Sequence, residues 1–502
     1  MNKKTVATLL ITLLAAAHLH GAVSKITSEK GERWWGLFYR GAPMEPFAES
    51  FKTTTPGKSM LVSSLGRYIW CDAAAEITFD GEDFSIESSE VLEIQKGGRN
   101  LREAYLVCCH KHCPPDAAVA PDPEQFTVPY YETGLEFGQA HSAQTLLEYA
   151  ARLRKEGFPA GVLVIGTGWS RMDGNFDFDP EYYPDPKAFV DGLHAMGFKV
   201  MLSASPRVWA SGRAYAPLRE GGSLVAGPDG EPVVASGHAG YTAYLDIRGE
   251  AVYETVREHL AALGTRYGVD GLRLQCAAAA DYLPAAECEA FTGRWMALGE
   301  VLPMCQREPD PLEVHSAKVM CIDQGVFGGW ASLPRALNDL LSGGLAGYAN
   351  CLFYWHGADS PAYAQDELLV ARTLQLCAML PLCTVPYAPW RAGERYTEVK
   401  NTIARRMEIN AYIREQLAES SRTAEPLVRN LEYGFPRSGF SDCTDQYMIG
   451  TRYLVAPILS PEGGMVRLPR GVWTDASGKR YKGPLVIPAR PGGEPLVFEL
   501  SK

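Results

Sequence analysis

The clearest acidic side chain at the end of an expected strand is Asp246, which closes the short run Tyr244-Leu245-Asp246. A carboxylate in such a place can accept hydrogen bonds from a ligand or move a proton. A second interpretation is equally open. Asp246 precedes Gly249 and Glu250, where a short acidic side chain would cap the N-terminus of a helix.

Three tryptophans, Trp169, Trp355 and Trp390, could line a binding site. Aromatic faces suit the apolar faces of small molecules because they offer a large apolar area at a modest entropic cost. Packing of these rings at the barrel rim is an equally good interpretation. Arg273 shares a strand face with Gln275, since alternate residues of a strand point the same way. We expect it to point into the barrel, where a cation needs a partner.

Residues 108–113 read Cys-Cys-His-Lys-His-Cys, a cluster of side chains that suit zinc. Their spacing is tighter than in the common zinc motifs, and two prolines follow at once. We therefore interpret the cluster as the end of a strand that enters a linker, and we predict no metal ion and no other cofactor. The pairing of the chain's twelve cysteines stays open, because buried free thiols explain several of them as well as disulfides do.

The elements that must position these residues change type along the chain. Residues 66–70 and 76–79 alternate apolar with polar side chains, as strands of a half-buried sheet do. From residue 160 onward, short apolar runs alternate with segments of helical spacing, such as strands at 160–165, 198–204 and 271–274 and helices at 187–196 and 250–263. A last amphipathic helix is expected around 399–411. This alternation predicts a parallel sheet, and its length suits a (β/α)8 barrel.

The predicted fold class is therefore multidomain, α/β plus all-β. A (β/α)8 TIM barrel at 121–424 is flanked by an N-terminal β-sandwich at 23–120 and a C-terminal β-sandwich at 425–502. Residues 1–22 are predicted to be a secretory signal peptide, because Lys3 and Lys4 precede a short apolar run that ends in small residues. We accordingly expect an exported protein, secreted or periplasmic.

The amino-acid composition limits the kinds of molecule that the protein is expected to bind. The 502 residues carry a net charge of −11, from 59 acidic and 48 basic side chains. This balance argues against nucleic acid and anionic membranes, which attract clustered cations. It fits a neutral or cationic small molecule. No stretch beyond the first segment has 18 uninterrupted apolar residues, so no membrane span is predicted. The oligomeric state stays open.

In collinear order, the chain resembles glycoside hydrolase family 31, the α-glycosidase type. The resemblance extends over nearly the whole chain after the signal peptide and rests on many short segments, at 34–36, 64–70, 101–105, 178–180, 184–186, 193–199, 267–271, 344–348, 388–390, 445–450 and 454–457. It implies an N-terminal β-sandwich, a (β/α)8 barrel, C-terminal β-domains and a carbohydrate or glycoside ligand. It also implies a retaining mechanism, in which one carboxylate attacks the anomeric carbon and a second carboxyl group transfers the proton.

The residues expected to carry that mechanism are replaced. The family's nucleophilic Asp ends the strand that here reads Gly-Leu-Arg-Leu-Gln, so the nucleophile position is Gln275. The acid/base Asp lies five residues before an aromatic that opens the next helix, which is Trp330 here, and the matching position is Gly325. Asp323, two residues away, is the candidate for a relocated acid. An amide cannot form the normal glycosyl ester, so the resemblance implies that the covalent step is lost.

Other pocket positions depart from the family as well. The acid that grips sugar hydroxyls is replaced in the segment 165–169, which reads Ile-Gly-Thr-Gly-Trp. His356 stands in the segment that matches the family's Asp-x-x-Gly-Gly, and the family's Arg before the acid/base loop is best matched by His315 or Lys318. Trp169, Asp246, Arg273, Gln275, Lys318, Trp355, His356 and Trp390 are the predicted substrate-binding residues, and Asp323 is the one catalytic candidate.

Three functions stay open at this point. The favoured one is an exported family-31-like protein that binds a glycan without the standard chemistry. The second is an active hydrolase that uses Asp323 with substrate assistance or with another carboxylate, such as Asp281 or Asp359. The third is a structural or interaction protein. Fold does not choose among them, because function lies in the site.

Overall fold

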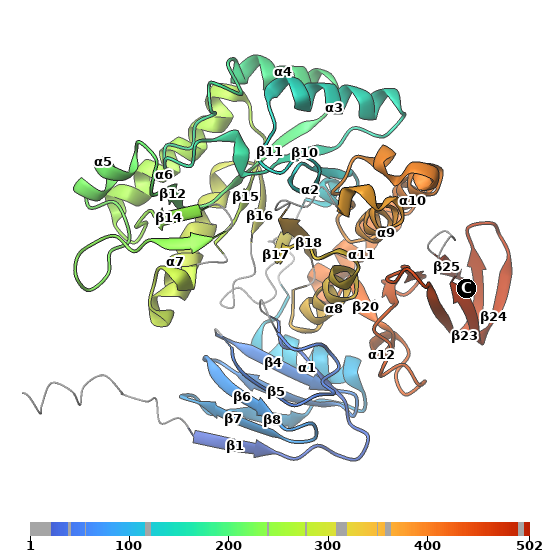
Figure 1. Cartoon of the computed structure of the whole chain (residues 1–502). Helices are drawn as coiled ribbons and strands as arrows, with labels where there is room; N and C mark the ends of the chain where they lie inside the picture. Colours follow the sequence, from blue (N-terminus) through green and yellow to red (C-terminus); the bar gives the residue numbers. More distant parts are fainter. Residues whose placement is uncertain are drawn as a thin grey trace, which may run out of the picture.

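The computed structural model describes residues 22–38, 42–55, 57–115, 122–237, 240–276, 279–307, 319–348, 350–356, 363–489 and 496–501. Two small β-sheets come first in the chain, a large mixed α/β region follows, and a last β-sheet ends it (Figure 1).

The N-terminal part is a pair of four-stranded antiparallel sheets. The first has the order β1 (Ala22–Ile26), β7 (Phe84–Ser88), β6 (Ala75–Phe79), β3 (Phe51–Thr54), and the second β2 (Trp34–Trp35), β4 (Ser59–Ser63), β5 (Arg67–Cys71), β8 (Glu93–Lys96). Both sheets contribute to one core, with Trp34, Leu61 and Ile69 from one meeting Ile77 and Phe84 from the other. Every second residue of β6 and β7 is buried, as the period of a strand requires.

A helix, α1 (Leu101–His112), stands where the sequence predicted a strand end at the cysteine cluster. That prediction was wrong. The Asn100 side chain caps the helix by accepting the N–H of Glu103, and the buried side chains follow helical spacing, at positions 101, 104, 105, 108 and 109. Cys108 and Cys109 are therefore core residues of a helix that packs against β4 and β5.

Eight parallel strands make the central sheet. Its order is β18 (Cys351–His356), β17 (Val319–Val326), β16 (Met304–Arg307), β15 (Gly271–Leu274), β11 (Lys199–Ala204), β10 (Val162–Ile165), β9 (Tyr130–Glu132), β19 (Thr384–Val385). The last strand, β19, pairs with the first, β9, so the sheet curls back on itself as in a TIM barrel. Among the described residues, no ladder joins β18 to β19.

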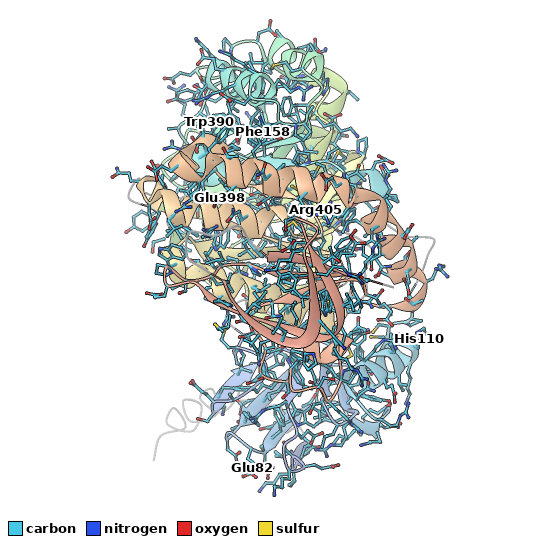
Figure 2. The ribbon with its side chains drawn as sticks, turned by 90° about the vertical axis from the view of Figure 1, so that its right-hand side faces the viewer. Glu82, His110, Phe158, Trp390, Glu398 and Arg405 are labelled. Carbon is cyan, nitrogen blue, oxygen red and sulfur yellow. The ribbon has the colours of Figure 1, made fainter. Side chains whose placement is uncertain are left out.

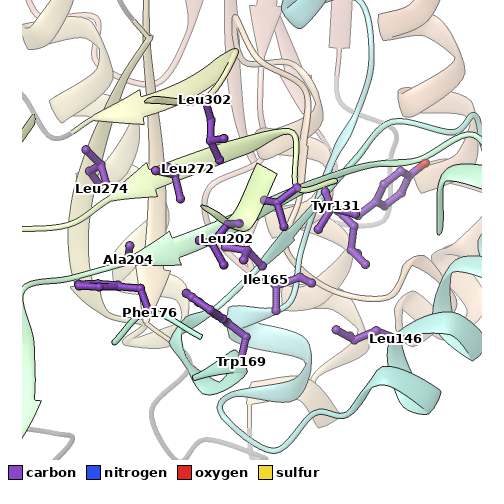
Figure 3. Close-up of a cluster of buried hydrophobic side chains, with 14 of the residues drawn as sticks. Tyr131, Leu146, Ile165, Trp169, Phe176, Leu202, Ala204, Leu272, Leu274 and Leu302 are labelled. Atoms are coloured by element: carbon purple, nitrogen blue, oxygen red, sulfur yellow. The ribbon is translucent and has the colours of Figure 1, made fainter. Parts of the chain in front are cut away.

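Helices follow most of these strands and cover the outside of the sheet. They are α3 (Ala143–Lys155), α4 (Pro186–Ala195), α6 (Glu250–Ala262), α7 (Ala285–Ala297), α8 (Ser332–Leu345), α9 (Glu367–Ala378) and α10 (Tyr396–Glu408). Figure 3 shows side chains of this core, to which Leu146 from α3 and Ile165, Leu202 and Leu272 of the strands belong. The strand predicted at 271–274 and the helix predicted at 250–263 are thus both present.

The helix predicted around 399–411 is two helices. α10 ends at Glu408, and α11 (Asn410–Thr423) begins after Ile409, whose ψ of 4° interrupts the helix. The two helices bury their apolar faces in different cores. Val399 and Ile403 join the first core of the barrel, whereas Ile409 and Ile413 join the second.

A small three-stranded antiparallel sheet is inserted between β11 and β15. Its order is β12 (Arg207–Trp209), β14 (Gly240–Tyr244), β13 (Ala235–Gly237), and α5 (Tyr215–Glu220) lies in its first connection. The insertion lies at one side of the barrel in Figure 1, and the sequence analysis did not predict it. The strand that precedes Asp246 is therefore β14 of this small sheet, and not a barrel strand.

The C-terminal part is a six-stranded antiparallel sheet. Its order is β20 (Val428–Asn430), β21 (Tyr447–Ile449), β22 (Tyr453–Ala456), β25 (Leu496–Leu500), β23 (Gly464–Asp475), β24 (Arg480–Ala489). Tyr105 of α1 donates to the carbonyl oxygen of Ala424 over 3.0 Å, and Arg102 pairs with Glu425, so the N-terminal part contacts the start of this region directly. Across the described ranges, no helix is both long enough and apolar enough for a bilayer span.

Candidate functional site

Gln275 lies immediately after β15, at the carboxyl end of the fourth barrel strand. Its backbone N–H donates to the carbonyl oxygen of Ala204, 2.9 Å away at the end of β11. Its side-chain Nε2 donates to the hydroxyl of Tyr354 on β18 over 2.8 Å. The position predicted for the nucleophile therefore holds an amide whose N–H is already engaged across the barrel.

A buried ion pair involves Arg273, two residues before Gln275 on β15. Arg273 donates through Nη2 to Oε1 of Glu132 on β9 and through Nε to Oε1 of Gln306 on β16, each over 2.7 Å. The side chains of Arg273 and Glu132 are only 4% and 8% exposed, so each charge is compensated by the opposite charge of its partner and hardly by water. The Arg273 guanidinium carbon also lies 5.1 Å from the Tyr354 ring centre.

The sequence analysis predicted that Arg273 points inward and needs a partner, but it did not find Glu132, Gln306 or Tyr354. Glu132 is the last residue of the short strand β9. A charged residue at the end of an apolar run is the sequence feature from which this partner could have been predicted. Gln306 lies opposite Arg273 on the adjacent strand β16, whereas Glu132 and Tyr354 lie on strands that do not neighbour β15, so the curling of the sheet brings these two to Arg273.

A narrow hollow of about 10 Å³ opens beside Gln275, where β10 and β11 end. It is lined by Thr167, Trp169, Ser170, Met172, Gly174, Phe176, Ser203, Ala204, Ser205 and Arg207. Figure 3 shows Trp169, Phe176 and Ala204 together at this point. Met172 and Phe176 hold left-handed backbone, with φ of 48° and 49°. Such strain in non-glycine residues is typical of functional segments.

A buried histidine supports the end of β10. His141 is 3% exposed, and burial lowers its pKa to about 4, although backbone hydrogen bonds, including one with Gly166, oppose the shift. The imidazole is therefore neutral near pH 7. Beside it, the N–H of Gly166 donates to the Thr133 hydroxyl over 2.8 Å. This strand end thus carries no charge where the family resemblance implies an acid.

Two of the three predicted tryptophans are packed inside the protein. Trp169 is 1% exposed and donates its indole N–H to the carbonyl oxygen of Ser203 over 2.7 Å. Trp355 is 4% exposed and makes edge contacts with Phe327 and Phe353. The rim-packing interpretation describes both rings in this structure, and a sugar contact by either stays a prediction.

Trp390 is half-buried and packs against helix α3. The Arg152 guanidinium carbon lies 3.9 Å from its ring centre, and Tyr149 meets it edge-on, both residues coming from α3. In Figure 2, Trp390 lies at the opposite end of the molecule from Glu82 of the N-terminal sheets. The three tryptophans therefore have separate packing partners in this structure.

Asp246 is held by its neighbour Arg248, which donates to both carboxylate oxygens over 2.7 Å. Burial alone would raise the pKa of Asp246, but the Arg248 hydrogen bonds and charge keep it below its usual range. The alternative helix-cap interpretation was wrong, because Gly249 is the N-cap of α6 and no side chain caps that helix end. Binding of substrate by Asp246 stays a prediction.

The expected acid/base region lies on β17 and β18. Asp323 is opposite Tyr354 in the β17–β18 ladder, and the register shifts between Asp323 and Val326, around Gly325. Trp330 lies in the single helical turn Gly329–Ala331 that leads into α8. Lys318, His315 and Asp359 lie outside the described residues, and so do the side chains of Asp323 and His356. No three His, Cys, Asp or Glu side chains gather as a metal site would need, within the part of the chain that the structure describes.

Comparison with known proteins identifies the family. Residues 125–307 match the TIM-barrel domain of glycosyl hydrolases family 31, and residues 424–496 match the C-terminal domain of that family. The chain belongs to glycosyl hydrolase family 31. The two matches cover about half of the chain. They fall on the curled sheet and on the C-terminal antiparallel sheet.

Curated relatives agree with this family. The mouse myogenesis-regulating glycosidase is 24% identical over 395 residues, 73% of this chain and 55% of that protein. An α-glucosidase of Saccharolobus solfataricus is 24% identical over 402 residues, 65% of this chain and 56% of that protein. The chain thus spans about half the length of these relatives. A solved family-31 dextranase of Flavobacterium johnsoniae shares the fold, with a TM-score of 0.78 at 18% identity over 95% of this chain and 66% of the dextranase.

Proposed function

We propose that this family-31 protein binds a carbohydrate at the carboxyl-end mouth of its barrel and does not carry out the family's double displacement. The observation that carries the proposal is the amide of Gln275 at the end of β15, engaged with the Tyr354 hydroxyl at 2.8 Å. A retaining site needs two carboxyl groups about 5–5.5 Å apart, one of them a nucleophile. An amide is a much weaker nucleophile than a carboxylate.

The second catalytic position supports the same proposal. Gly325 on β17 has no side chain that could donate a proton to a leaving group. The mouth nonetheless offers hydrogen-bonding groups to a sugar, from Gln275, Thr167 and Ser203. The dextranase with the similar fold was solved in complex with glucose, which supports a sugar as the ligand of this barrel.

The test uses the full-length purified protein. We expect no turnover of a panel of aryl α- and β-glycosides, together with a rise in melting temperature when particular sugars are added. Gln275→Ala should reduce the sugar-induced shift, whereas Gln95→Ala, on the exposed strand β8 of the N-terminal part, should leave it unchanged.

The two other functions predict different results. Turnover that disappears in Asp323→Ala would replace the proposal with a hydrolase that has a relocated acid. Absence of any thermal shift across a broad glycan panel would favour a structural or interaction protein.

We also propose that the protein is exported. Lys3, Lys4 and the apolar run after them support a cleaved signal peptide. Mass determination of the N-terminus after expression in an exporting host should find cleavage within the first 22 residues or so. An intact N-terminus in the cytosolic fraction would contradict export.

A further inference from the structure

Arg207 differs from the most deeply buried arginines of the described ranges. Those arginines meet a carboxylate or several carbonyl oxygens, as in the pairs Arg273–Glu132, Arg307–Glu300, Arg372–Glu398 and Arg429–Glu425 and in the three carbonyl contacts of Arg406. Arg207 is half-buried, and its Nε is buried without a hydrogen-bond partner. Within the described residues, it forms no ion pair with Asp or Glu. A half-buried cation whose Nε is buried without a partner is costly, so this position suits an anion from outside.

The surroundings of Arg207 are aromatic and neutral. It begins β12, three residues after the end of β11, and lies opposite Tyr244 in the small sheet. Tyr244 in turn stacks on Tyr282 with ring centres 3.8 Å apart. Burial opposes the charge of Arg207, but the phenol groups of Tyr244, Tyr282 and Tyr354 raise its pKa. The guanidinium therefore remains charged at every working pH.

The hollow that Arg207 lines is adjacent to Gln275. Ala204, which accepts the backbone N–H of Gln275, is also a wall of the hollow. Its volume of about 10 Å³ has room for about one water-sized group and not for a sugar ring. Only the tip of a sugar substituent, such as one oxygen atom of it, would enter there.

The charges at this mouth are unusual for a carbohydrate site. Gln275, Gly166 and Thr167 are neutral where the family resemblance implies acids, and Glu132 is neutralised by Arg273. The described lining of the hollow contains one charged side chain, Arg207. The net negative charge of the whole chain suggested a neutral or cationic ligand. Charges farther away than a Debye length of about 8–10 Å are largely screened, so the groups near the hollow decide which ligand charge is favoured there.

We infer that Arg207 binds the anionic substituent, a carboxylate or a sulfate-type group, of an acidic sugar at the mouth of the barrel. This inference rests on the proposed carbohydrate-binding function and names its ligand class. A planar guanidinium can bind either group through paired N–H donors.

The test is calorimetric titration of the full-length protein with three probes, methyl α-glucoside, methyl α-glucuronide and glucose 6-sulfate. We expect at least one acidic probe to bind about 10-fold or more tightly than the neutral one, with an affinity that falls as salt is raised. The two acidic probes distinguish a carboxylate from a sulfate-type group. Inorganic sulfate is a fourth probe, and binding as tight as that of the acidic sugars would overturn the sugar part of the inference.

Variants assign the effect to the guanidinium. Arg207→Gln should weaken the acidic probe by about 10-fold to 100-fold and leave the neutral probe nearly unchanged. Arg207→Lys should retain part of the affinity, because it keeps the charge but loses the planar donor pair. Arg213→Gln, an exposed residue of the same insertion, is the matched control.

The outcomes separate the two proposals. Binding of neutral sugars with no preference for acidic ones, or an unaltered affinity in Arg207→Gln, overturns the Arg207 inference and leaves the proposed function standing. Absence of binding to any sugar overturns both. If Arg207→Gln fails to fold, the preference of the unmodified protein for acidic probes and its salt dependence still decide the inference.

Discussion

Gln275 donates its side-chain amide hydrogen to the hydroxyl of Tyr354, 2.8 Å away, and so links the ends of two barrel strands, β15 and β18. Beneath this contact the Arg273 guanidinium lies 5.1 Å from the Tyr354 ring centre and pairs with Glu132. Among the described residues, Gln275, Tyr354, Arg273 and Glu132 thus form a linked polar cluster in which the one cation is paired with the one anion. Position 275 itself carries an amide and no carboxylate.

Tyr354→Phe removes the hydroxyl that accepts the Gln275 amide. We expect a loss of about 1 kcal/mol in the free energy of unfolding and a several-fold weaker sugar affinity, because the amide is then free to rotate. Denaturant unfolding and calorimetry measure the two effects. Tyr481→Phe, which removes a hydroxyl bonded to Asp475 in the C-terminal sheet, is the control. Unchanged sugar affinity in Tyr354→Phe would place the ligand elsewhere.

Gln275→Asp tests the alignment with the catalytic strand. Alone it should give no turnover, because Gly325 still supplies no proton donor, and it should weaken acidic sugars by about 10-fold through charge repulsion. Combined with Gly325→Asp it should yield slow hydrolysis of aryl glycosides with good leaving groups. Gln275→Asn with Gly325→Asp is the matched control and should stay inactive. Equal activity of the two double variants would show that position 275 is not the nucleophile position.

Glu132→Gln tests the buried ion pair. We expect a loss of about 3–5 kcal/mol in the free energy of unfolding, because the charge of Arg273 stays buried without its counter-ion. The double variant Glu132→Leu, Arg273→Met should lose less than the sum of its two single variants, and a double-mutant cycle by urea unfolding measures the difference. The exposed pair Arg219–Glu231 is the comparison, with an expected coupling below about 1 kcal/mol. Additive losses at Glu132 and Arg273 would contradict the coupling.

Glu45 makes stability depend on pH at the contact between the N-terminal part and α8. Its Oε1 accepts the N–H groups of Gly36 and Leu37 over 2.7 Å, and its own N–H donates to Asn338 over 2.9 Å. Burial raises the pKa of Glu45 from 4.5 to about 8, although the two backbone N–H groups oppose the shift. The folded protein therefore holds a proton here that the unfolded chain releases.

Proton linkage gives the direction in which the free energy of unfolding changes with pH. Below pH 4.5 Glu45 is protonated in both states, and the stability is at its full value. As the pH rises to about 8, the unfolded chain releases this proton while the folded protein keeps it, so the stability falls. Glu45→Gln should equal the unmodified protein near pH 4.5 and exceed it at pH 9 by up to roughly 5 kcal/mol, at about 1.4 kcal/mol per pH unit. Urea unfolding from pH 4.5 to 9 measures this difference, with exposed Glu82→Gln as the control. A difference that does not grow with pH would contradict a protonated Glu45.

The sequence by itself determined the order of the parts and most of the barrel elements. The strand at 271–274 and the helix at 250–263 follow from local apolar periodicity, which a single segment carries. Gln275 directly follows β15, and Gly325 lies next to the last residue of β17. Their assignment to the nucleophile and acid/base positions rests on the family resemblance and stays a prediction.

Only the tertiary structure decided which residues meet. Glu132 and Tyr354 come from strands that do not neighbour β15, and the curling of the sheet brings them to Arg273. The small inserted sheet places Arg207 at the mouth and takes Asp246 away from the barrel strands. The packing of Trp169 and Trp355 was also undetermined, since an aromatic residue at a strand end can face either core or solvent. Periodicity reports which face of an element is apolar, whereas contacts between distant elements depend on how the whole chain packs.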